Sequence, residues 1–164
     1  MKTDAIAVAN YFVDLAEEEK CELKQFGLMK RVYITHGLCL AILNKSALNP
    51  RFDVVEAWKN GPVIPSVYHS FKHNKNLPIK EKSVIAEWTG METKYHTPEL
   101  AHDCDDIKEI AAAVFEKYRG FTDAEMIALL HRDGTPWALC YEEGKNNKIP
   151  DLYTKVFYKK VLGL

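Results

Sequence analysis

KQFGLMKRVYITHGLCLAIL, the stretch from Lys24 to Leu43, carries apolar residues on nearly every side of a helix. A helix that is apolar all round belongs in the middle of a hydrophobic core, so this stretch predicts a central helix around which the rest of the chain packs. Two glycines interrupt it, Gly27 and Gly37. Because each glycine costs a helix about 1 kcal/mol relative to alanine, we expect close helix packing at these positions to compensate.

The sequence on both sides of this segment predicts further helices. Before it, apolar residues from Ala5 to Ala16 recur at helical spacing behind Thr3, a residue type suited to cap a helix N-terminus. After it come several helix start signals, namely prolines at first helical positions, a run of aspartates and a capping box. They place helices from Pro65, from about Asp103 to Gly120, from Thr122-Asp123-Ala124-Glu125, from Thr135-Pro136, and from Ile149-Pro150-Asp151 through Tyr153, Val156, Phe157 and Val161.

The fold class that follows is mainly α: a single compact multi-helix domain, residues 1–164, with about six helices around the central apolar helix. We also expect a minor short β-hairpin near residues 52–58 and 83–88. Residues 52–58 fit a helical turn equally well, because periodicity does not separate the two in so short a segment. Asn60-Gly61-Pro62 predicts a turn between residues 52–58 and the helix from Pro65.

Bulk composition narrows the class of protein. The chain has 164 residues, 47% of them hydrophobic, and a formal net charge of -1. That length suits one domain, and the balanced charge provides no positive field to attract nucleic acid or an anionic membrane. The four cysteines form no C-x-x-C pair, and the N-terminus has no apolar signal region. We therefore expect a protein of the cytoplasm with no membrane partner.

Three motifs are more specific than the signals that predict helices. They are LMKRVYITHG at Leu28–Gly37, EAWKNGPVIPSVY at Glu56–Tyr68, and FTDAE at Phe121–Glu125 followed by Leu129, His131 and Thr135-Pro136-Trp137. In type, order and spacing they resemble the Panacea domain, a family that includes SocA-like antitoxins and phage-associated GepA-like proteins. The chain departs from the family pattern at Arg31-Val32 and Ile34, and Arg132-Asp133-Gly134 lengthens the step before Pro136.

The resemblance implies an antitoxin that neutralises a protein toxin by direct binding, in a bacterial, prophage or other mobile-element setting. The toxin would be encoded beside it, and the protein would not be an enzyme. No cofactor, metal or catalytic residue is implied. The motif residues carried over as candidates for partner binding are Lys30, Tyr33, Trp58, Gly61, Pro62, Val63, Pro65, Tyr68, His131 and Trp137.

The Glu56–Tyr68 motif has both a structural and a functional interpretation. Gly61 suits a positive φ, and Pro62 stiffens the turn, while the aromatic side chains of Trp58 and Tyr68 brace it. A rigid element of this kind also suits a partner surface, where Trp and Tyr are favoured anchors.

Other classes of function stay open at this stage. One cluster has metal-binding residue types but not the spacing of a zinc motif: His96, His102, Asp103, Cys104, Asp105 and Asp106. A small metal-dependent hydrolase that uses this cluster is therefore one alternative. A mobile-element scaffold protein with a non-toxin partner is another. Lys155, Lys159 and Lys160 form a basic edge on the last helix that favours a solvated face over a DNA contact. An exposed apolar patch would indicate a homo-oligomer or a partner surface.

Overall fold

A computed structural model describes residues 4–164 and confirms a mainly α fold. Helix α1 begins at Ala5, where the Asp4 side chain accepts a hydrogen bond from the Ala7 amide as N-cap; Thr3, the cap expected from sequence, lies outside the described residues. The described chain contains seven α-helices, each in a segment where the sequence predicts one. They are α1 (Ala5–Glu18), α2 (Gln25–Ile42), α3 (Pro65–Phe71), α4 (Asp105–Tyr118), α5 (Asp123–Leu130), α6 (Pro136–Cys140) and α7 (Asp151–Leu162), with short 3-10 helices η1 (Lys72–Asn74) and η2 (His102–Cys104).

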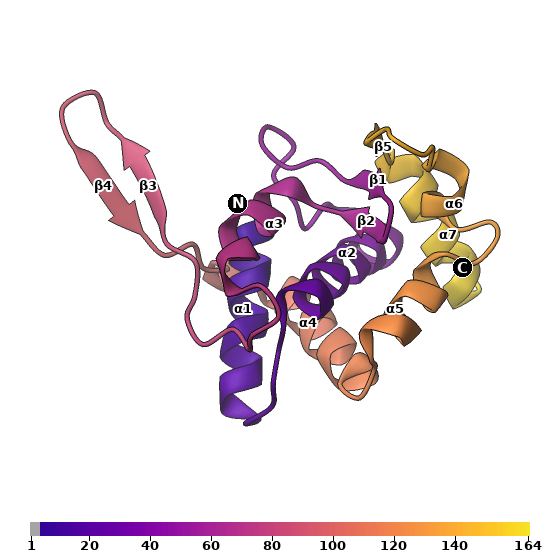
Figure 1. Ribbon diagram of the computed structural model, residues 1–164, viewed down its shortest axis with the longest axis horizontal. Helices are drawn as coiled ribbons and strands as arrows, with labels where there is room; N and C mark the ends of the chain where they lie inside the picture. The colour runs from indigo at the N-terminus through magenta and orange to yellow at the C-terminus, as the bar shows by residue number, and fades with distance from the viewer. Residues whose placement is uncertain (1–3) are drawn as a thin grey trace.

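Helix α2 is the centre of the fold, as its sequence predicts (Figure 1). It packs against α1, α3, α4, α5 and α7 and against the strand that precedes α3. Gly37 is where α7 comes closest, because a Cβ at that position would lie 2.2 Å from the Tyr158 ring. At Gly27 the missing side chain makes room for the Arg31 guanidinium of the same helix. Close helix packing therefore accounts for Gly37 as expected, but not for Gly27, which makes room for a side chain of its own helix.

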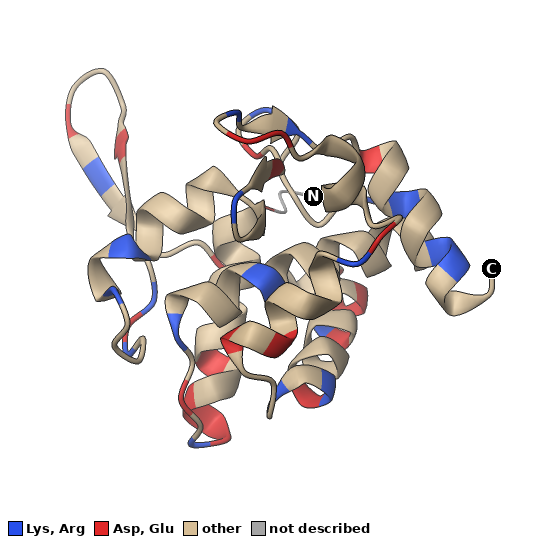
Figure 2. Ribbon diagram, turned by 45° about the vertical axis from the view of Figure 1, so that its right-hand side comes forward, with Lys and Arg blue, Asp and Glu red and all other residues tan. Residues whose placement is uncertain are grey.

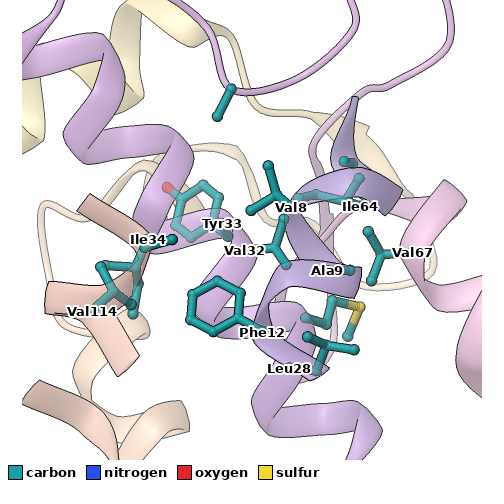
Figure 3. Packing of buried hydrophobic residues seen from close by; sticks show 14 of the residues in the cluster. Val8, Ala9, Phe12, Leu28, Val32, Tyr33, Ile34, Ile64, Val67 and Val114 are labelled. Atoms are coloured by element: carbon teal, nitrogen blue, oxygen red, sulfur yellow. The ribbon is translucent and has the colours of Figure 1, made fainter. Parts of the chain in front are cut away.

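The hydrophobic core fills the space between α2 and its neighbours (Figure 3). Phe12 of α1, Val32 and Ile34 of α2 and Val114 of α4 are all buried in this core, and the Phe12 ring lies 6.4 Å from that of Phe115 of α4. The exposed positions of α4 are mostly polar, which explains why its helical pattern is readable from sequence, whereas α1 is exposed only at its end, at Glu17 and Glu18.

The strands form two small sheets. Strand β1 (Glu56–Trp58) pairs antiparallel with β2 (Gly61–Val63) and with β5 (Asn147–Lys148), giving the order β2-β1-β5. Strand β3 (Ile85–Trp88) pairs with β4 (Thr93–His96) in a hairpin that projects from the helical body (Figure 1). Residues 52–58 and 83–88 thus each contribute a strand, but to separate hairpins.

The turn expected at Asn60-Gly61-Pro62 lies one residue earlier. Trp58 pairs with Gly61, so Lys59 and Asn60 form the connection, while Gly61 and Pro62 already belong to β2. Pro62 is accommodated because a strand at the edge of a sheet does not need every backbone donor. Among residues 4–164, no helix combines the length and the apolar character needed to cross a bilayer.

Candidate functional site

The β1–β2 hairpin, which contains most of the Glu56–Tyr68 motif, is fixed to α2 by a buried lysine. The Lys30 side chain has 0% exposure, and its Nζ donates a hydrogen bond of 2.7 Å to the carbonyl oxygen of Pro62. The same ammonium group lies 4.9 Å from the centre of the Phe26 ring. A cation that contacts a carbonyl dipole and a ring face has partial compensation for leaving water, and it anchors the hairpin on the helix.

Lys30 has no carboxylate within ion-pair distance in the described part of the chain. Burial therefore lowers the pKa of its amine to about 7, with the more distant charge of Asp123 acting in the opposite direction. Removing a charge from water favours the neutral form of a lysine, which is the physical cause of this shift. At a pH near 7 the Lys30 amine is therefore protonated in only part of the molecules.

Gly61 brings the hairpin close to a second titratable side chain. Its φ is +108°, and a Cβ there would lie 3.1 Å from Lys30 Nζ and 3.3 Å from His131 Nε2. The Nε2 atom of His131 is buried and has no hydrogen-bond partner among the described residues. Burial lowers the pKa of His131, and the neighbouring charge of Lys30 lowers it further. The protonated form of Lys30 therefore disfavours protonation of His131.

An aromatic stack continues from His131 across α6. The His131 and Trp137 rings are stacked with centroids 3.6 Å apart, and Trp137 stacks on Tyr141 at 4.6 Å. The indole N–H of Trp137 donates to the carbonyl oxygen of Trp58 at 2.7 Å. The third sequence motif, which contains His131 and Trp137, thus holds the second motif through a backbone carbonyl of β1.

The aromatic pair Trp58 and Tyr68 lies on the partly exposed side of the hairpin. Their rings meet edge to face at 5.0 Å, and Trp58 donates from its indole N–H to Glu56 at 2.8 Å. Gln25 of α2 donates to the Tyr68 carbonyl at 3.0 Å. Pro65 occupies the first turn of α3, as its position in the sequence predicts.

The structure therefore brings most of the candidate residues into one cluster. We call this cluster the hairpin anchor, made up of Lys30, Trp58, Gly61, Pro62, Tyr68, His131 and Trp137. Val63 is buried in β2 and belongs to the core. Tyr33 lies elsewhere, because its ring faces Tyr158 of α7 at 6.3 Å and its hydroxyl lies 3.5 Å from Thr154.

One important residue was not singled out from sequence. Asp53 accepts hydrogen bonds from the Ala5 amide at 2.8 Å, the Asn49 amide at 2.9 Å and the Ser66 hydroxyl at 2.6 Å. It thereby joins the start of α1, the preceding loop and the first turn of α3. An aspartate just after a turn is common, so no local signal reveals this role.

The cluster proposed for a metal-dependent hydrolase does not assemble. His96 lies in β4 of the projecting hairpin, whereas residues 102–104 form η2 and residues 105 and 106 begin α4. Asp106 pairs with Lys45 at 2.6 Å, and Asp105 pairs with Lys108 at 3.0 Å. Within residues 4–164 no three His, Cys, Asp or Glu side chains are grouped so as to hold a metal ion. The hydrolase alternative therefore lacks its ligand set.

The hairpin anchor contains one group whose chemistry suggests a base, and its environment argues against that use. A lysine with a near-neutral pKa is typical of some catalytic sites. Lys30, however, has no exposed surface and its Nζ is committed to Pro62. A substrate would have to displace the hairpin to reach it, so the cluster is built to hold β1–β2 in place.

Comparison with known proteins agrees with this picture. The family described as Antitoxin SocA-like, Panacea domain, matches residues 28–138, a range that includes every residue of the hairpin anchor. The chain is 30% identical over 135 residues to Antitoxin SocA of Caulobacter vibrioides (strain NA1000 / CB15N), covering 82% of this chain and 68% of that protein. No solved structure matches.

Proposed function

Since this chain belongs to the SocA-like, Panacea domain family of antitoxins, we propose that it neutralises a protein toxin by binding it directly, without covalent chemistry. We further propose that it acts in the cytoplasm and that its partner is encoded beside it. Its four cysteines are free thiols, which is consistent with a reducing compartment.

The observation that carries this proposal is the fixed position of the β1–β2 hairpin. Lys30 donates a hydrogen bond to the Pro62 carbonyl, and Trp137 donates one to the Trp58 carbonyl. The rings of Trp58 and Tyr68 are partly exposed, and the hairpin backbone that carries Trp58 is held by these two hydrogen bonds before any partner binds. Binding through a preorganised aromatic surface avoids much of the entropic cost of ordering loops.

We propose that the partner surface includes the exposed side of Trp58 and Tyr68 and the Lys59-Asn60 turn between the strands. The backbone of this surface would be supported by Lys30, Gly61, Pro62, Val63 and His131. The adjoining helices would be fixed by Pro65, Trp137 and Tyr33. Of the motif residues, only those at the exposed side of the hairpin would touch the toxin.

The test is co-expression with each neighbouring open reading frame under an inducible promoter. We expect one of them to arrest growth, this protein to relieve the arrest, and the two chains to co-purify. A Trp58→Ala, Tyr68→Ala double variant should lose relief while retaining the far-ultraviolet circular dichroism of the parent. The matched control is Trp88→Ala in the projecting hairpin, which removes a 67% exposed tryptophan from a different surface.

Each outcome separates one alternative. Full relief of toxicity by the folded double variant would show that this surface is not required. A stable complex with a neighbouring product that never arrests growth would favour the scaffold function. No arrest and no complex with any neighbour would contradict the antitoxin proposal.

A further inference from the structure

Helix α7 has a second, unpartnered face. Its inner face contributes Thr154 and Tyr158, which are buried against α2 at Gly37. On the outer face the aliphatic side chains Leu152 and Val156 are 65% and 59% exposed, and Val161, on another side of the last turn, is 60% exposed. Of the apolar residues that reveal this helix in the sequence, Phe157 packs against the core, whereas Tyr153, Val156 and Val161 are exposed.

This outer face forms one side of an apolar groove. Leu139 of α6, which is 65% exposed, and the Asp133-Gly134 loop form the other side, and the half-buried Phe157 contributes to its lining. The groove has a volume of about 680 Å³. A contiguous apolar surface of this kind on a monomer is typical of a protein-binding site.

The shape and the spacing favour a helix as the occupant. Leu152 and Val156 are one helical turn apart and form a ridge along α7, with Val161 continuing the apolar surface toward its end. Ridges of this spacing pack into the grooves between side chains of a second helix. An amphipathic helix that places residues from successive turns in a groove is a recurrent mode of protein recognition.

The charge around the groove selects the kind of helix. Helix α7 carries Lys155, Lys159 and Lys160 against a single acidic residue, Asp151, although the chain as a whole has a net charge of -1 (Figure 2). Lys160 and Asp133 both line the groove, so the excess of positive charge beside it comes from Lys155 and Lys159 of the same helix. A second copy of this chain would bring the same excess of positive charge against itself, whereas an acidic partner would be attracted.

We propose that the α6–α7 groove binds an acidic amphipathic helix of the toxin, with its apolar side chains against Val156 and its carboxylates against Lys159 and Lys160. This inference rests on the proposed function, because it assigns the toxin a second contact beside the hairpin surface. The α6 helix joins the two regions, since Trp137 faces the hairpin anchor and Leu139 faces the groove.

The groove can be tested separately from the toxin with a synthetic probe. A fluorescein-labelled amphipathic peptide with leucines on one face and glutamates on the other is titrated with the complete protein, and anisotropy is measured. We expect saturable binding that weakens at least tenfold in a Leu152→Asp, Val156→Asp variant and in a Lys159→Glu, Lys160→Glu variant. Leu77→Asp, which changes a 70% exposed leucine outside the groove, is the matched control and should bind as the parent does.

The same variants are then tested on the complex identified by co-expression. The proposal expects the aspartate variant to lose at least tenfold in affinity for the toxin, and added salt to weaken the parental complex more than that of the glutamate variant. Unchanged toxin binding by both variants would overturn the groove while leaving the antitoxin function intact. Absence of any complex with the parental protein would overturn the toxin assignment, and the peptide titration would still report whether the groove selects acidic helices.

Two further results would replace the proposed occupant. If light scattering shows a dimer of the free protein that the aspartate variant dissociates, a second copy occupies the groove. If a DNA duplex binds the parental protein and the aspartate variant alike but not the glutamate variant, the lysines serve nucleic acid. Circular dichroism and thermal unfolding of every variant verify that the substitutions, all at exposed positions, leave the fold intact.

Discussion

Replacing Lys30 with methionine should change how the stability of the protein depends on pH. Lys30 is wholly buried, and its amine has a pKa of about 7 in the folded protein against an ordinary value of 10.5. Between these two values the unfolded chain binds a proton that the folded protein does not. The free energy of unfolding must therefore rise with pH in this window. Methionine keeps an unbranched side chain and removes the titrating group.

The size of the effect follows from the pKa difference. The slope approaches about 1.4 kcal/mol per pH unit once the folded amine is neutral. Because half of the amines are already neutral at pH 7, the parental protein should gain about 1.6 kcal/mol from Lys30 between pH 7 and pH 8.5. Burial raises the pKa of Cys39 to about 12, which opposes this trend only above its ordinary value of 9.0, so the range stops at pH 8.5.

The measurement is urea unfolding, followed by circular dichroism at several pH values between 6 and 8.5, on the parent and on Lys30→Met. Subtracting the two curves cancels the contributions of titrating groups that do not interact with Lys30; His131, whose pKa Lys30 lowers, contributes mainly below its ordinary value of 6.5. The control is Lys24→Met, which removes an exposed lysine at the start of the same helix and should leave the pH dependence unchanged. Parallel curves for the parent and Lys30→Met over this range would refute the inference that the Lys30 amine is desolvated in the folded protein.

Three further predictions concern the hairpin anchor and the helix beside it. Gly61→Ala should destabilise the protein by about 1–3 kcal/mol in urea unfolding, because alanine is strained at a φ of +108° and its Cβ would lie 3.1 Å from Lys30 Nζ. The control is Gly90→Ala, at a φ of +92° with open space around it, which isolates the backbone contribution. Trp137→Phe should cost about 1–3 kcal/mol because the Trp58 carbonyl loses its donor at 2.7 Å, and a smaller loss than 0.5 kcal/mol would mean that water replaces it. Thr122→Ala should lower stability by about 1 kcal/mol because its hydroxyl accepts from the Glu125 amide at the start of α5, while an unchanged melting temperature would contradict this role.

The helices were largely predictable because the signals that start and end them are local. The capping box at Thr122 and Glu125 forms as the sequence predicts, and Thr135 caps α6 with Pro136 in its first turn. The central position of α2 was also predictable, since no exposed helix could carry so many apolar side chains. The paired strands were less so, because β1, β2 and β5 have two or three residues each and are defined by their partners.

The candidate site was predictable in composition but not in geometry. The three sequence motifs supply Lys30, Gly61 and His131, yet nothing in their local sequence places Lys30 Nζ and His131 Nε2 around the same glycine. The role of Asp53 has no local signal in the sequence, because its hydrogen bonds join segments that are distant in the chain. The orientation of α7 was equally undetermined, because both of its faces carry large side chains.

By itself the sequence determined the fold class and most helix boundaries, because each depends on residue types within a turn or two of one another, and its three motifs identified the family. Only the tertiary structure decided that Lys30 is buried without a carboxylate, that Tyr33 serves the α7 contact, and that Val156 faces outward. These properties depend on which surfaces exclude water when distant segments pack together. Burial and desolvation are collective properties of the whole fold, and a local pattern contains no record of them.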